Sequence, residues 1–171
     1  MNTLRTPLSR FAPLAVLVVV ALLPVLFVSC SDDDNPVTPP WEFADLEQQT
    51  HAKINAYRVS KGLAALAWSD IIVEQARLHS SNMAAGTTAF GHDGFSDRAA
   101  AIAKQIAWSS AGENVAMLSN MSDAATVAVN AWLASPGHKA NIEGNFNTTA
   151  IGIAKASDGT LYFTQIFIKT K

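Results

Sequence analysis

Hydrophobic and polar positions follow two periods along this chain, a helical period first and a strand period near the C-terminus. Between residues 43 and 135, apolar side chains recur at spacings of three and four, the period of an amphipathic helix. This period predicts four helices, over residues 43–61, 69–85, 96–106 and 122–135. Ser69 and Ser96 are the predicted N-caps of the second and third helices. Pro136 and Gly137 are expected to end the fourth helix.

The last third of the chain changes to patterns that are typical of β-strands. Residues 150–154 and 161–168 are short apolar runs rich in isoleucine, phenylalanine and tyrosine. Asp158-Gly159 between them favours a hairpin turn. Residues 112–117 are consistent with a further strand. Because helical patterns come first and strand patterns last, the sequence predicts an α+β fold and not a doubly wound parallel sheet.

The first thirty residues have the pattern of an export signal. Residues 11–28 carry no charge and follow a segment with two arginines and no acid. As a helix they would span only about 27 Å at about 1.5 Å per residue, which is marginal for a bilayer core. The run ends in Leu-Phe-Val-Ser-Cys and resembles a bacterial lipobox, in which Cys30 is acylated, although Phe27 stands where leucine is usual. An uncleaved membrane anchor is the alternative, and both interpretations place the rest of the chain outside the cytoplasm.

Three segments are therefore predicted: a lipoprotein signal peptide over 1–29, a lipidated cysteine with an acidic and proline-rich linker over 30–40, and a folded domain over 41–171. The linker has three acids and three prolines, so it cannot form a core and is expected to be extended. Its acidic run resembles the surface-export signal of some bacterial lipoproteins, and a merely solvated linker is the alternative. We expect a lipoprotein of the bacterial cell envelope, at the outer membrane or cell surface, whose lipid anchor binds the membrane.

Charge and cysteine content exclude several classes of function. The formal net charge is −2, and residues 41–171 hold ten Lys/Arg and eleven Asp/Glu. This balance does not suit a basic nucleic-acid binder, so no nucleic-acid partner is expected. Because Cys30 is the only cysteine, neither a disulfide framework nor a multi-cysteine zinc site is available.

The candidate chemistry rests on four histidines and a few acids. His51 is predicted to be a solvated residue of the first helix, and His79 a hydrogen-bonded core residue of the second. His92 and His138 each follow a glycine in a predicted loop, and Glu113 stands just before an apolar strand pattern. Two imidazoles and a carboxylate are enough to hold a divalent metal. A polar cluster that ties helix ends to the sheet is the structural alternative.

Several short motifs follow one another in a fixed order between residues 55 and 165. They are Asn55-x-x-Arg58-x-x-x-Gly62-Leu63-x-x-Leu66-x-Trp68, Ala76-x-x-His79-Ser80-x-x-Met83, Phe90-x-His92, Gly112-Glu113-Asn114-Val115-Ala116, Trp132-x-x-Ser135-Pro136-Gly137-His138-x-x-Asn141-Ile142, Ile151-Gly152-Ile153 and Tyr162-Phe163-Thr164-Gln165. In order and spacing this set resembles the CAP superfamily, or SCP domain, which includes cysteine-rich secretory proteins, venom allergens and plant pathogenesis-related proteins.

The resemblance implies an α/β/α sandwich with a central antiparallel sheet, and a cavity lined by two histidines and two glutamates. His92, Glu113 and His138 match three of these four positions. Ser135 stands where many eukaryotic members carry the second glutamate, and the cysteines of those members are absent. The incomplete set implies moderate zinc affinity without an obvious general base. Binding by neutral imidazoles is expected to weaken below a pH of about 6.5.

We therefore expect an extracytoplasmic, lipid-anchored binding module. Its His/Glu cleft would take a divalent cation such as zinc and an unknown extracellular ligand, namely a lipid, a glycan or a protein. The first alternative is a metal-dependent or serine-type hydrolase acting on envelope or host polymers, with Glu113 as the candidate catalytic residue. Nothing singles out a nucleophile, and no G-x-S-x-G elbow exists. The second alternative is a structural envelope protein.

Overall fold

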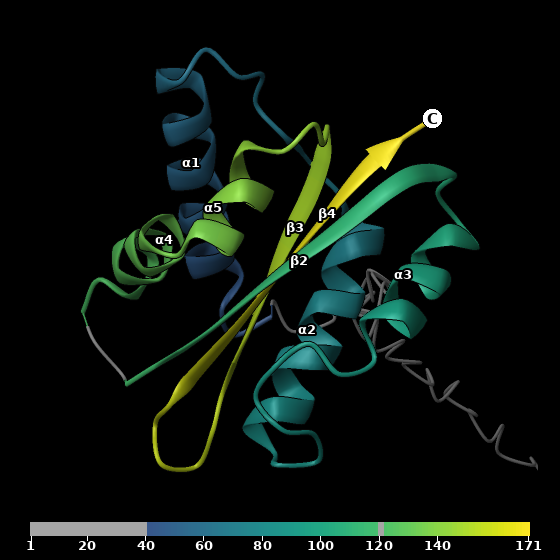
Figure 1. Ribbon diagram of the computed structural model, residues 1–171. Helices are drawn as coiled ribbons and strands as arrows, with labels where there is room; N and C mark the ends of the chain where they lie inside the picture. The colour runs from purple at the N-terminus through teal and green to yellow at the C-terminus, as the bar shows by residue number, and fades with distance from the viewer. Residues whose placement is uncertain (1–40, 120–121) are drawn as a thin grey trace, which may run out of the picture. The chain divides into compact units, whose positions relative to one another are not determined.

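The computed structural model describes residues 41–119 and 122–171, so the predicted signal peptide, Cys30 and the linker lie outside the described residues. Helices and strands alternate irregularly along the described part (Figure 1). In chain order the elements are α1 (Ala44–Ser60), β1 (Ala67–Trp68), α2 (Asp70–Ala84), α3 (Phe95–Ala103), β2 (Trp108–Leu118), α4 (Ala124–Ala134), α5 (Pro136–Glu143), β3 (Thr148–Lys155) and β4 (Leu161–Thr170). Within residues 41–119 and 122–171, every helix is too short or too polar to cross a bilayer.

The strands form one four-stranded sheet in the order β1-β3-β4-β2. β4 pairs antiparallel with both β3 and β2, and the two-residue β1 adds to β3 in parallel. The hairpin predicted around Asp158-Gly159 joins β3 to β4, with Gly159 in the left-handed region at φ 88°. β2 is an edge strand of this sheet, and its outer edge carries the candidate site.

Helices cover both faces of the sheet, which confirms the expected α/β/α sandwich (Figure 1). One core joins the sheet to α1, α4 and α5, and the other joins it to α2 and α3. Strand β4 shows the alternation that two covered faces require, because Phe163 and Phe167 enter the first core while Ile166 and Ile168 enter the second.

Helix α2 lies unusually close to the sheet. A Cβ added to Gly152 of β3 would stand only 2.1 Å from the backbone nitrogen of Arg77, so a side chain has no room there. The hydroxyl of Ser80 donates to the carbonyl of Gly152 at 2.8 Å. At the start of this helix Ser69 accepts from the backbone N–H of Ile72, as predicted for an N-cap. These contacts fix the position of α2 relative to the strands.

Some predicted helix boundaries are wrong. Helix α3 begins at Phe95 after Gly94, whose φ of 75° turns the chain, so Ser96 lies inside the helix and is not its N-cap. The helix ends at Ala103, earlier than predicted. Pro136 follows the end of α4 but also begins α5, because proline at the first helical position has no N–H to leave unsatisfied. His138 consequently lies in a helix and not in a loop.

Trp132 joins α4 to the edge strand. Its side chain is almost completely buried in the first core, and its indole N–H donates to the carbonyl of Val115 at 2.9 Å. Val115 lies in β2, so this bond also satisfies a carbonyl on the outer edge of the sheet.

Replacing this tryptophan tests the core assignment. Trp132→Ala is expected to lower the free energy of unfolding by about 3–5 kcal/mol, because the change opens a cavity in a packed core. Urea denaturation followed by circular dichroism measures the effect. Trp132→Phe, which keeps most of the ring volume but loses the N–H, should cost less. An unchanged unfolding midpoint in Trp132→Ala would show that the assignment of this face is wrong.

Candidate functional site

The three predicted site residues come together at the outer edge of β2. Glu113 lies in β2, His92 lies in the loop before α3, and His138 lies in α5. Nδ1 of His92 is 3.0 Å from Oε1 of Glu113. The ring centroids of His92 and His138 are 6.3 Å apart, and their planes are inclined by 54°. The fold therefore places two imidazoles side by side, with a carboxylate behind one of them.

The carboxylate of Glu113 is buried and paired with Arg98, a residue that sequence reasoning did not single out. Nε of Arg98 donates to Oε2 of Glu113 at 2.9 Å, and Nη2 donates to Oε1 at 2.8 Å. The Glu113 side chain is only 1% exposed. This bidentate ion pair, together with His92, engages both carboxylate oxygens. Glu113 is thus placed to orient His92 and does not face solvent as an open ligand.

This arrangement determines which nitrogen of His92 carries the proton. An ionised carboxylate only accepts hydrogen bonds, so Nδ1 must be the donor in its bond to Glu113. In the neutral ring Nε2 then holds the lone pair. Among the described residues Nε2 of His92 has no hydrogen-bond partner, and the His92 side chain is 51% exposed. The neutral form of His92 therefore presents a bare nitrogen to the surface of the molecule.

Arg98 also holds the loop on which His92 lies. Its Nη1 donates to the carbonyl of Asp93 at 2.8 Å, while the same guanidinium pairs with Glu113. A Cβ added to Gly94 would stand 3.3 Å from this Nη1, so the glycine both turns the chain and leaves room for the guanidinium. One side chain of α3 thus connects the loop to the edge strand.

His79 also holds the loop that carries His92. It is buried in α2, and its Nε2 lies 2.8 Å from the carbonyl of Gly91, to which it donates. Burial lowers the pKa of His79 below the ordinary histidine value of 6.5. The residue is therefore a neutral, hydrogen-bonded core histidine, as the sequence predicted, and it fixes the backbone next to His92.

Two asparagines fasten α5 to the strand edge. Nδ2 of Asn141 donates to the carbonyl of Glu113 at 3.0 Å and to Oδ1 of Asn114 at 2.9 Å. Nδ2 of Asn114 in turn donates to the carbonyl of His138 at 3.1 Å. Both asparagines stand in the motifs quoted above, but sequence reasoning gave them no role. They place the helix that carries His138 beside the strand that carries Glu113.

The environment of His138 keeps its imidazole neutral. Burial lowers the pKa of His138, and the neighbouring His92 lowers it further. A neutral imidazole is the form that binds metal ions. No hydrogen bond to either ring nitrogen of His138 is found within residues 41–119 and 122–171.

The donors present fit a metal ion only in part. His92 and His138 supply two suitable nitrogens, but in the part of the chain that is described no group of three or more His, Cys, Asp or Glu is arranged to hold a metal ion. Among the same residues, no serine hydroxyl is hydrogen-bonded to either ring. The site offers a pair of nitrogen donors and no assembled nucleophile.

His51 differs from its prediction. The ring was expected to be solvated, but it is half-buried, with Nε2 2.9 Å from the carbonyl of Leu66 and an edge-on contact to Trp68 at 5.3 Å between centroids. Burial lowers the pKa of His51. The residue ties α1 to the segment before α2, on the side of the sheet away from β2.

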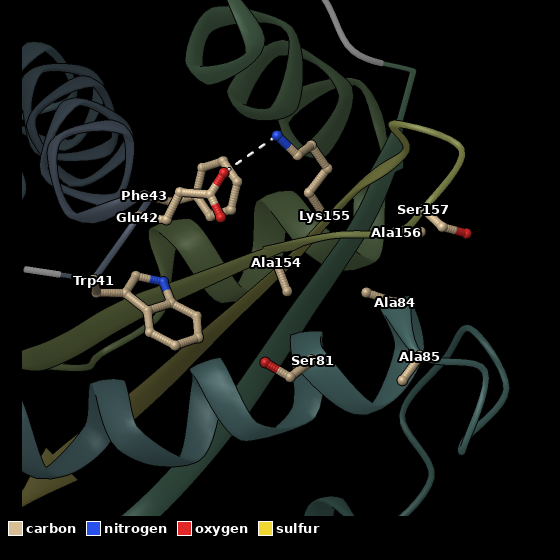
Figure 2. Close-up of a pocket in the computed structure, with 10 residues that line it drawn as sticks. All are labelled: Trp41, Glu42, Phe43, Ser81, Ala84, Ala85, Ala154, Lys155, Ala156 and Ser157. Atoms are coloured by element: carbon tan, nitrogen blue, oxygen red, sulfur yellow. Dashed lines mark hydrogen bonds and ion pairs between the residues drawn. The ribbon is translucent and has the colours of Figure 1, made fainter. Parts of the chain in front are cut away.

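A separate cleft of about 490 Å³ lies where the described chain begins (Figure 2). The indole N–H of Trp41 donates to the carbonyl of Ile153, and the guanidinium of Arg77 lies 5.1 Å from the ring centroid. Lys155 and Glu42 form an ion pair of 3.2 Å across the cleft. This hollow lies beside β3. Among the described residues that line it there is no histidine, and it is distinct from the histidine pair beside β2.

Comparison with known proteins identifies the family. The chain belongs to the CAP, or cysteine-rich secretory protein, family, whose family model matches residues 51–167. This confirms the resemblance seen in the motifs. A search of curated proteins gave no significant match.

Solved structures show the same fold. An outer surface protein from Borrelia burgdorferi has a TM-score of 0.63 and 20% identity, over 77% of this chain and 97% of that chain. An extracellular SCP-domain protein from Bacillus anthracis has a TM-score of 0.58 and 30% identity, over 72% of this chain and 40% of that chain. A cysteine-rich secretory protein from Staphylococcus aureus has a TM-score of 0.58 and 17% identity, over 73% and 39% respectively. This chain thus matches only about two-fifths of the last two proteins.

Proposed function

We propose that this protein is an extracytoplasmic, lipid-anchored binding module whose ligand site is the His92/His138 pair. The observation that carries the proposal is the bare Nε2 of His92 beside a neutral His138, backed by a buried carboxylate that orients the first ring. An exposed histidine without a specific role does not need a buried ion pair to orient its ring. Because Arg98 and Glu113 form such a pair and orient the exposed ring of His92, we favour a binding role for this histidine.

A divalent cation, zinc above all, suits this pair of donors. Metal-binding histidines commonly donate their other ring N–H to a carboxylate, which is the relation between His92 and Glu113. Glu113 would then orient the ring of His92 and would not itself bind the metal. Two protein ligands leave coordination positions for groups of an extracellular molecule, and they imply moderate affinity.

The hydrolase alternative has less support. A general base must reach the proton that it removes, but Arg98 and His92 engage both oxygens of the buried Glu113. Among the described residues no serine is hydrogen-bonded to either histidine. Binding without catalysis accounts for these features with fewer assumptions.

The extracytoplasmic location is supported by the relatives, two of which are described as an outer surface protein and as an extracellular protein. The lipid anchor rests on Cys30 and the export signal before it. Stable attachment needs more than one acyl chain, which an acylated N-terminal cysteine provides in lipoproteins.

Mass spectrometry of the mature protein tests the anchor. We expect an N-terminus at Cys30 that carries acyl chains, and we expect Cys30→Ala to remain unprocessed or leave the membrane fraction. Recovery of residues that precede Cys30 in the mature wild-type protein would contradict the lipoprotein assignment.

Zinc titration by calorimetry tests the binding site. The wild type should bind zinc with moderate affinity, and His92→Ala or His138→Ala should abolish binding, because each removes one of two donors. Glu113→Gln should weaken binding about 10–100-fold through loss of the orienting carboxylate.

His51→Gln is the matched control, because it removes a half-buried histidine outside the site and should leave zinc binding intact. Circular dichroism verifies that each variant is folded. Unchanged binding in the His92→Ala, His138→Ala double variant would contradict the proposed site, and absence of binding to the wild type would favour a structural cluster.

A further inference from the structure

The histidine pair provides two donors, whereas zinc in proteins takes four ligands. Glu113 is not available as a third, since Arg98 and His92 engage its oxygens. Within residues 41–119 and 122–171, no other His, Cys, Asp or Glu completes a cluster with the pair. The remaining ligands of a bound zinc must therefore come from outside this part of the chain.

We propose that a second copy of the chain supplies them, so that one zinc ion joins two molecules through His92 and His138 of each. This inference rests on the proposed function of the pair as a metal site. Two-fold pairing is the commonest arrangement of identical subunits, and it presents the same surface patch twice. A half-site with two donors is completed by such a pairing, and the partner's His92 and the partner's His138 would fill the open positions.

The surface next to the pair is suited to such a contact. Phe90 and Met117 are two of the few large apolar side chains that remain exposed in the described residues, at 48% and 50%. Both lie beside Tyr162: the Phe90 ring centroid is 6.4 Å from that of Tyr162, and Met117 is its direct partner in the β2–β4 ladder.

Both apolar residues are near the site residues in the sequence. Phe90 is two residues before His92, and Met117 lies on the same face of β2 as Glu113 because their separation in the strand is even. Exposed apolar side chains that are grouped together are typical of an interaction surface. A second copy held at the histidines would cover this patch.

Charge does not oppose the pairing. Residues 41–171 hold ten Lys/Arg and eleven Asp/Glu, so two copies repel each other little.

Sedimentation velocity of the full chain in a mild detergent tests the proposal. The chain is first stripped with EDTA, and zinc is then added in steps while its uptake is measured. In the wild type the protein mass of the particle should double, uptake should saturate at one zinc per two chains, and EDTA should reverse both changes. Phe90→Ser combined with Met117→Ser should require about tenfold more protein to pair, since the apolar contact is lost.

The controls separate this proposal from the proposed function. His92→Ala and His138→Ala keep the same N-terminal segment, so association through that segment is the same in all samples. Both variants should remain monomeric and take up no zinc, whereas His51→Gln should form dimers like the wild type. One zinc bound per single chain would overturn the pairing and leave the metal site in place. Absence of zinc uptake by the wild type would overturn both, and assembly that persists in the histidine variants would overturn the pairing.

Discussion

The buried ion pair between Arg98 and Glu113 is the interaction on which the site depends. The two side chains are 9% and 1% exposed, so each charge needs the other to offset the cost of leaving water. Loss of one partner from such a pair costs about 3–5 kcal/mol, because the remaining charge stays buried. The same guanidinium holds the carbonyl of Asp93, and the same carboxylate accepts from His92. Helix α3, the loop before it and strand β2 are thereby held in one arrangement.

The rest of the fold supplies rigid supports for this pair. The close seating of α2 on Gly152 fixes His79, which in turn holds the backbone carbonyl of Gly91 next to His92. On the other side, Asn141 fastens α5 to the edge of β2 and so positions His138. The two histidines thus approach each other from opposite faces of the sheet, around its outer edge. Only an edge strand allows this, since an inner strand would have a neighbour where the pair lies.

Local patterns predicted most of the fold because helices and strands bury their faces at characteristic periods. The hairpin at Gly159 and the strand β4 follow from these patterns directly. Helix α5 was missed because Pro136 both stops one helix and starts the next.

The convergence of His92, Glu113 and His138 followed from the family's motifs and not from spacing. Arg98 was missed because an arginine in a short amphipathic helix is expected to face solvent until its long-range partner is known. The exposure of His51 was predicted wrongly because its hydrogen-bond partner, the carbonyl of Leu66, lies 15 residues away in the sequence.

The proposed binding site, in which the oriented ring of His92 lies beside a neutral His138, depends on one protonation state. The most direct test is nitrogen-15 NMR of the His92 ring in the metal-free protein, at a pH at which the ring is neutral. Because Glu113 accepts from Nδ1, the proton should reside on Nδ1 and Nε2 should be bare. In Arg98→Ala, where the carboxylate is no longer held, this preference should weaken. A wild-type His92 with its proton on Nε2, or with no preference between the two nitrogens, would contradict the site described above.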